Sequence, residues 1–151
     1  DYWKPNLHRK ALLKLVENEG AKNLSDLLIN NKSKITKLLR SNLEFGQNIN
    51  KTDIKKIKED LLKLKIKTQK IFETFDLILT PTTPQSAFKI EKEQPLNQAN
   101  FTSLANISDL PAISLPYNGT YEQPFSIQLN AANNNDKILL KISSIFEKIL
   151  Q

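Results

Sequence analysis

The chain has 151 residues, 39% of them hydrophobic and 25% charged, a composition that fits one globular domain and excludes a chain disordered throughout. Its net charge is +6, it has no cysteine, and its one histidine is His8, so disulfides and thiolate chemistry are excluded and a zinc site is not expected. No apolar run approaches the roughly 20 residues needed to cross a bilayer, and the N-terminus lacks a secretory signal, so a cytoplasmic protein without membrane contact is expected.

The positive charge comes mostly from lysine, since Arg9 and Arg40 are the only arginines. Sequence-specific nucleic-acid binding favours arginine for base readout and bidentate phosphate contacts. We therefore interpret the charge as solvated lysine, and nucleic acid is not expected as a partner. A basic helical module that binds nucleic acid stays open as an alternative, which salt-dependent binding would reveal.

The first half of the chain has helical periodicity. Apolar residues recur every three or four positions over residues 7–16, and Gly20 is the expected end of this helix. Two shorter helices are expected around residues 24–31 and 35–39.

The strongest apolar stripe runs over residues 53–75, with Asn50 or Thr52 as the expected N-cap. Lysines occupy most of the other face of this helix. They are interpreted as a solvated face over a buried stripe rather than as a surface for RNA or anionic lipid.

After residue 76 the pattern changes to short apolar runs. Residues 77–79 are expected to form a buried strand, which leads into a loop constrained by Pro81. Residues 85–99 are polar and predict a loop, and residues 101–107 predict a short helix.

Two further strands are expected at residues 111–116 and 124–130. Asn118-Gly119 between them suits the turn of a hairpin. The last helix is predicted over residues 136–150, where a regular apolar stripe recurs.

These elements predict an α/β fold within one domain of residues 1–151, helical over residues 1–75, with strands, loops and a final helix over residues 76–151. Three strands alone make a thin sheet that needs further neighbours. The chain also has no methionine, which indicates a segment of something longer. We therefore expect the isolated chain to expose apolar surface and to associate.

A search for catalytic chemistry finds none within the chain. The glycines Gly20, Gly46 and Gly119 lie far apart, so no phosphate-binding loop is formed. His8 is expected on a helix surface, and neighbouring carboxylates such as Glu59 and Asp60 lie in a polar stretch, where they are solvated. No catalytic residue, cofactor or metal is expected.

Three blocks of sequence carry a resemblance. Residues 75–84 read FDLILTPTTP, directly after the long helical stripe. Residues 110–116 read LPAISLP, preceded by Phe101-Thr102 and Asn106, and residues 124–129 read PFSIQL ahead of the final helix. In this order and spacing the blocks resemble the amidase-signature family, from about residue 39 to residue 150.

The resemblance implies an α/β fold in which helices wrap a mixed sheet, this chain forming its C-terminal part. It implies hydrolysis of an amide C–N bond through a Ser–cisSer–Lys triad that lies upstream, so the chain alone is expected to be inactive. The implied partners are a small-molecule amide substrate and the upstream catalytic portion of the same enzyme. The candidate substrate-binding residues nearest the matching motifs are Thr82, Thr83, Asn106 and Ser108, although turn and cap bonding would explain them at least as well.

Four positions depart from the family's pattern. Glu91, Asp109 and Ser126 stand where the family usually has glycine, and replacing a glycine of positive φ costs about 1 kcal/mol or more. They indicate a reshaped pocket or a sequence drifting under weak selection. Ala99 is the fourth position. In the A subunit of the glutamyl-tRNA amidotransferase, a member of the same family, this position usually holds an aspartate that helps to bind the amino group of glutamine. A general amidase is therefore favoured, and the amidotransferase component stays an alternative.

Overall fold

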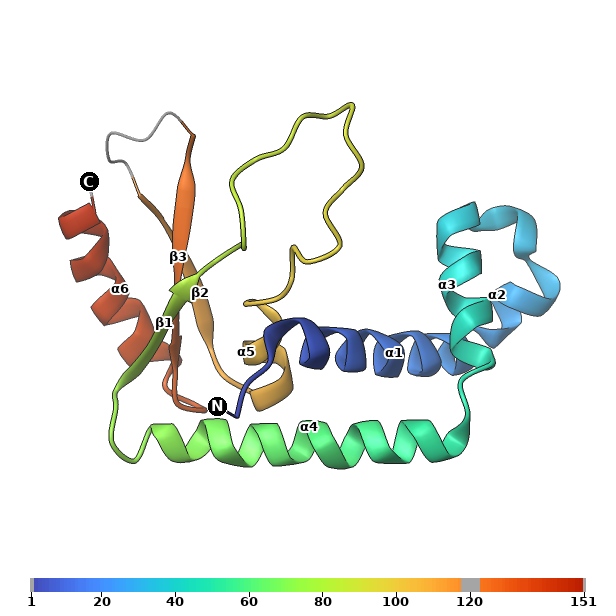
Figure 1. Ribbon diagram of the computed structural model, residues 1–151, viewed down its shortest axis with the longest axis horizontal. Helices are drawn as coiled ribbons and strands as arrows, with labels where there is room; N and C mark the ends of the chain where they lie inside the picture. Colours follow the sequence, from blue (N-terminus) through green and yellow to red (C-terminus); the bar gives the residue numbers. More distant parts are fainter. Residues whose placement is uncertain (1, 118–122, 151) are drawn as a thin grey trace. The chain divides into compact units, whose positions relative to one another are not determined.

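The computed structural model describes residues 2–117 and 123–150 and divides the chain into two compact units. One unit comprises residues 10–61, and the other comprises residues 1–9 together with residues 62–151. Two helices, α1 (Pro5–Asn23) and α4 (Lys51–Ile71), are shared between the units (Figure 1). Among residues 2–117 and 123–150, no helix has both the length and the apolar character needed to cross a membrane.

The unit of residues 10–61 is helical. Besides its parts of α1 and α4 it contains α2 (Ser25–Asn30), the 3-10 helix η1 (Lys32–Lys34) and α3 (Lys37–Gln47). The Thr36 hydroxyl accepts a hydrogen bond from the Leu39 amide at 3.2 Å and caps α3, while the side-chain oxygen of Asn50 accepts from the Thr52 amide at 2.8 Å ahead of α4. The core of this unit is formed by apolar side chains from α1, α2 and α3, namely Ala21, Leu28 and Leu43, with Leu24 and Ile35 packed against them.

The prediction that Gly20 ends the first helix is wrong, because α1 continues to Asn23. A glycine inside a helix costs about 1 kcal/mol relative to alanine, a cost that packing can offset. At this position a β-carbon would lie 3.3 Å from the Leu43 side chain, so Gly20 packs closely against α3.

Gly46 marks an even closer approach of α3 to α1. A β-carbon on Gly46 would lie 2.1 Å from the carbonyl oxygen of Glu17, which is backbone and cannot move aside. The Asn18 side-chain amide donates a buried hydrogen bond of 2.9 Å to the Gly46 carbonyl. Only glycine allows the two backbones to meet in this way.

The other unit contains an antiparallel sheet of three strands, β1 (Leu77–Pro81), β2 (Ala112–Tyr117) and β3 (Phe125–Ala131), in the order β1-β3-β2. All three predicted strands are confirmed. The turn predicted at Asn118-Gly119 lies outside the described residues. The mixed sheet that the resemblance implied would need strands beyond these three.

One face of the sheet is apolar and is covered by α6 (Asp136–Leu150), whose bounds match the prediction. In Figure 1, α6 lies on one side of the strands and α5 (Ser103–Ser108) on the other. The core between α6 and the sheet consists of Leu115, Leu129, Ala131 and Leu139, with Leu77, Ile113, Ile127, Phe146 and Leu150 packed against it.

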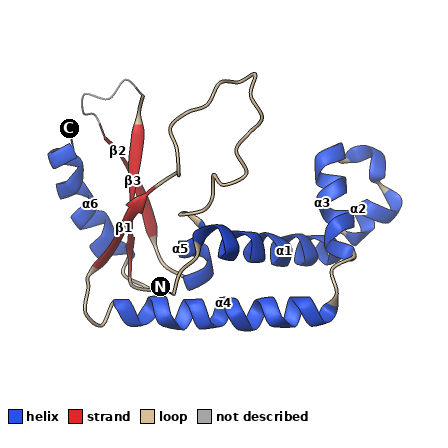
Figure 2. Cartoon of the chain, in the orientation of Figure 1, coloured by secondary structure: helices blue, strands red, loops and turns tan. Residues whose placement is uncertain are grey.

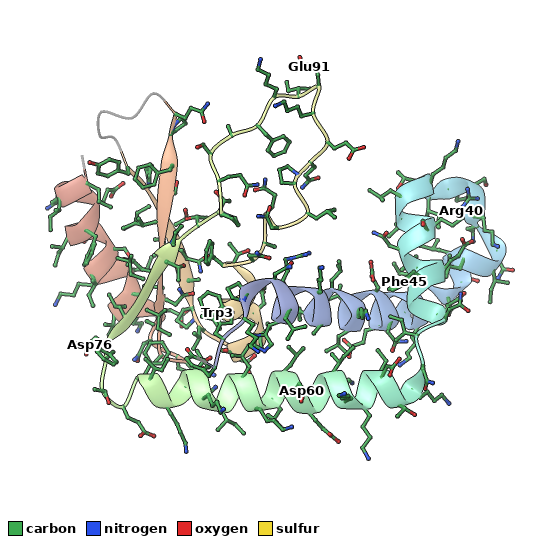
Figure 3. All side chains as sticks on the ribbon, in the orientation of Figure 1. Trp3, Arg40, Phe45, Asp60, Asp76 and Glu91 are labelled. Carbon is green, nitrogen blue, oxygen red and sulfur yellow. The ribbon has the colours of Figure 1, made fainter. Side chains whose placement is uncertain are left out.

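The strand at residues 77–79 was predicted to be buried, and this part of the prediction is wrong. Leu79 is 54% exposed, because β1 is an edge strand and α6 packs on β2 and β3. A long loop without helix or strand links β1 to α5, as expected for residues 85–99 (Figure 2). Glu91, one of the three glycine replacements, is exposed at the tip of this loop (Figure 3).

The short helix α5 ends at Asp109, which has the left-handed backbone conformation with φ 52° and ψ 48°. This is a conformation that glycine adopts freely and aspartate tolerates. The Asp109 carboxylate forms an ion pair with Lys65 of α4, and the Gln69 amide donates to the Ser108 carbonyl at 3.3 Å. Two contacts therefore hold the end of α5 against α4, one of them made by the residue that replaces glycine.

Gly46→Ala is expected to lower the free energy of unfolding by about 1–3 kcal/mol, because the added methyl group collides with backbone. Gly20→Ala is the matched control, since the flexible Leu43 side chain can move, and it should be neutral or stabilising by up to about 1 kcal/mol. Urea unfolding followed by circular dichroism measures both variants. Equal stabilities for the two would contradict the close approach of α1 and α3.

Asp109→Ala is expected to lower the free energy of unfolding by about 1–2 kcal/mol, since alanine is strained in the left-handed region and cannot pair with Lys65. Asp109→Gly should change it by less than about 1 kcal/mol, because backbone freedom offsets the lost, largely exposed ion pair. Thermal unfolding of the two variants tests this difference. A glycine variant as unstable as the alanine variant would show that the backbone conformation is not the constraint.

Candidate functional site: the polar face of the sheet

The face of the sheet opposite α6 carries polar side chains from all three strands. Residues directly opposite each other in an antiparallel sheet point to the same face, and successive residues alternate between faces. The register pairs Thr80 and Ser114 with Gln128, which places the three in one row across the sheet. We call this surface the polar face, made up of Thr80, Thr82, Ser114, Ser126, Gln128 and Asn130.

The inner part of the polar face is buried. The Gln128 side-chain amide donates to the Asn130 side-chain oxygen at 3.2 Å, and the Asn130 side-chain amide donates to the Ile78 carbonyl at 3.3 Å. The Thr80 hydroxyl is buried without a hydrogen-bond partner among the described residues.

Thr82 stands at the outer end of the polar face. Its hydroxyl lies 2.8 Å from that of Ser114, and its amide donates to the Ser126 carbonyl at 2.9 Å. This hydroxyl pair is exposed and can bind polar groups of a ligand. The partner of each hydroxyl is another hydroxyl rather than a base, so the pair lacks the arrangement that activates a nucleophile.

The other three candidate site residues are engaged locally or buried. The Thr83 hydroxyl donates to the Gln85 carbonyl at 2.9 Å within the loop, and the exposed Asn106 side-chain amide donates to the Thr102 carbonyl at 3.2 Å. Ser108 is fully buried, and its hydroxyl has no partner in the part of the chain that the structure describes. Of the four candidates, only Thr82 belongs to the polar face.

Sequence reasoning missed Thr80, Ser114, Gln128 and Asn130. A signal for part of this set was available, because Ser126, Gln128 and Asn130 alternate with the apolar residues of β3. Such alternation ordinarily indicates a face open to solvent. The burial of the polar residues at this end of β3 depends on how the unit packs, so the alternation pattern could not predict it.

The polar face is built from neutral hydroxyl and amide groups. Such groups orient a ligand through hydrogen bonds but neither accept a proton near neutral pH nor bind metals strongly. Among residues 2–117 and 123–150, no three histidine or acidic side chains gather where they could hold a metal ion. The arrangement therefore fits a binding wall rather than a complete active site.

Two lysines of α4 are already paired with carboxylates. Lys58 forms an ion pair with Glu19 at 3.4 Å, and Lys65 forms one with Asp109. These contacts reduce the positive charge that α4 could offer to a phosphate backbone.

The chain is similar to a known protein family and to known sequences. A family model described as Amidase matches residues 6–140. The A subunit of the glutamyl-tRNA(Gln) amidotransferase from Pseudothermotoga lettingae is 40% identical over 83 residues, which are 52% of this chain and 18% of that protein. Its counterpart from Thermotoga maritima is 34% identical over 90 residues, covering 57% of this chain and 19% of that protein. The chain thus matches less than a fifth of the length of these relatives.

Solved structures agree on the fold over nearly the whole chain. A crystal structure of an amidase superimposes with a TM-score of 0.84 at 18% identity and covers 95% of this chain and 36% of that one. A bacterial aryl acylamidase of the amidase-signature family superimposes with a TM-score of 0.68 at 17% identity, covering 89% of this chain and 32% of that one. With a family model that matches residues 6–140 and a fold shared with these enzymes, the chain belongs to the amidase family, as its sequence blocks indicated.

Proposed function

We propose that this chain is the C-terminal part of an amide hydrolase that works in the cytoplasm. The observation that carries the proposal is the family match over residues 6–140, in a chain that corresponds to 36% of a solved amidase. Because this match spans both compact units, we assign them to one amidase domain. The Ser–cisSer–Lys triad that cleaves the C–N bond would come from the upstream portion of the enzyme.

In this proposal the chain supplies a wall of the substrate pocket. The exposed hydroxyls of Thr82 and Ser114 would contact a polar group of a small amide, and the buried inner part of the polar face, Thr80, Gln128 and Asn130, would fix the strands behind them. Thr83, Asn106 and Ser108 would shape the same wall less directly. Two of these three use their side chains to bond nearby carbonyl groups, and the third is buried.

The chain alone is expected to hydrolyse no amide, whereas the chain combined with its upstream portion should hydrolyse small aliphatic or aromatic amides. Ammonia release from a panel of such amides measures this for each polypeptide alone and for the two together. Hydrolysis by the chain alone would contradict the proposed division of roles, and a reconstituted pair that binds but cleaves nothing would contradict the assignment as a hydrolase.

In the reconstituted enzyme, Thr82→Val is expected to lower kcat/KM by about tenfold, the effect of one lost hydrogen bond to substrate of about 1.4 kcal/mol. Thr74→Val makes the same chemical change at an exposed position after α4 and is the matched control. Steady-state kinetics on the best amide of the panel measures both. Equal kcat/KM values for the two variants would remove Thr82 from the binding wall.

A second candidate is the A subunit of a glutamyl-tRNA amidotransferase. It is favoured by relatives of that name at 33–40% identity over about half of this chain. The exposed Ala99 disfavours it, since the resemblance implied an aspartate there in that protein. Glutamine is the substrate that separates the candidates: ammonia release from glutamine, with little from simple amides, would select the amidotransferase component.

A further inference from the structure

The helical unit of residues 10–61 contains a pocket of about 380 Å³ that shares no residue with the polar face. Helix α1 contributes Asn18, Ala21 and Lys22 to its lining, α2 contributes Ser25, and α3 contributes Gln47. Asn18 and Ala21 are buried and form the floor, whereas Lys22 and Gln47 are exposed and form the rim. Pockets that bind small organic molecules commonly have volumes of about 300–1,000 Å³.

Asn18, on the floor of this pocket, has a hydrogen-bond acceptor that no described residue uses. Its side chain is 7% exposed, and its side-chain amide nitrogen donates to the Gly46 carbonyl at 2.9 Å. Because a carbonyl can only accept, this bond fixes which end of the Asn18 amide faces Gly46. The side-chain oxygen is buried without a partner among the described residues. A ligand that carries an N–H donor would complete the hydrogen bonding of Asn18.

Lys22 is the one charged residue among those that line the pocket. It stands four positions after Asn18, so the two side chains are neighbours on one face of α1. In the part of the chain that the structure describes, no carboxylate forms an ion pair with Lys22. The acidic residue nearest to it in the sequence, Glu19, pairs instead with Lys58 at 3.4 Å. The Lys22 ammonium group is therefore available to an anionic group of a ligand.

We propose that this pocket binds a small carboxylate that carries an N–H donor, an inference that is independent of the proposed function. Lys22 would pair with the carboxylate, and the side-chain oxygen of Asn18 would accept a hydrogen bond from the N–H. The Ser25 hydroxyl and the Gln47 side-chain amide form no hydrogen bond with a described residue and would bind the remaining polar atoms of the ligand.

Other classes of ligand match the pocket less completely. A simple anion such as acetate would pair with Lys22 but has no donor for the Asn18 oxygen. A neutral amide such as acetamide would bind to Asn18 but would leave Lys22 without a counter-charge. A metal ion is opposed by the positive charge of Lys22. The combination of a carboxylate with an N–H donor is the one that uses both groups.

An NMR titration of the full 151-residue chain with N-acetylglycine tests the proposal, because this molecule has one carboxylate and one amide N–H. Binding should shift the backbone amide signals of Ala21 and Ser25 and the side-chain amide signals of Asn18 and Gln47. The expected dissociation constant is about 1 mM or below, as is reasonable for so small a ligand. The absence of shifts at these four residues would overturn the proposal.

Two analogues of the ligand test the two contacts without altering the protein. The methyl ester of N-acetylglycine has no carboxylate, and acetoxyacetate has an ester oxygen in place of the N–H. Each should bind at least about tenfold more weakly than N-acetylglycine, since each loses one hydrogen-bonded or charged contact. Equal affinity for either analogue would contradict the contact that it removes and overturn the proposal.

Substitution of Lys22 provides a second test. Lys22→Gln should weaken binding of N-acetylglycine by at least about tenfold, because it removes the charge that pairs with the carboxylate. Lys37→Gln is the matched control: it makes the same change at the exposed first residue of α3, about 15 Å along the helix from Gln47, and should leave the affinity unchanged. Equal affinities of the two variants would overturn the proposal.

The same titration in the presence of the separately produced upstream portion of the enzyme tests whether the pocket stays open to a ligand. Unchanged binding is expected. Loss of binding on formation of the complex would show that protein covers the pocket and would overturn its assignment as a ligand site. Amide hydrolysis is not used as a readout, so failure of this proposal leaves the proposed function untouched.

Discussion

The central strand β3 determines how the sheet-bearing unit is organised. It pairs with β1 on one side and β2 on the other, and its residues alternate between two faces of opposite character. Leu129 faces the apolar layer beneath α6, while its neighbours Gln128 and Asn130 face the polar side. A slip of one residue would exchange these faces, burying amides under α6 and exposing leucine. The polar face depends on this register.

The three residues that replace glycine are compatible with a stable fold and do not indicate that the fold is being lost. Of the three, only Asp109 has a positive φ, a conformation that aspartate tolerates, and its carboxylate pairs with Lys65. Ser126 has an ordinary strand backbone, and Glu91 is exposed in a loop. None of these residues is forced into a conformation it cannot hold. We therefore expect the binding wall to be reshaped by the new side chains rather than lost.

Much of the fold could be predicted from the sequence, because helix and strand periodicities are strong here. The bounds of α6 and the positions of all three strands were predicted from apolar spacing and from the proline and capping residues that flank these elements. The prediction that Gly20 ends the first helix was wrong. The packing of Gly20 against Leu43 is a tertiary contact, which the local sequence does not reveal. The predicted burial of Leu79 was wrong for a similar reason, because its exposure depends on the order of the strands in the sheet. The candidate site was predicted only in part: Thr82 belongs to the polar face, while burial of Gln128 and Asn130 follows from packing and not from alternation.

The register of β3 determines which residues lie on each face of the sheet, and NMR contacts between α-hydrogens measure this register. In an antiparallel sheet these contacts are strong only between opposed residues that are not hydrogen-bonded to each other. We expect them between Leu79 and Leu129 across β1 and β3, and between Ser114 and Gln128 across β2 and β3. Contacts shifted by one residue, such as Leu79 with Gln128, would place the amides beneath α6 and contradict the polar face.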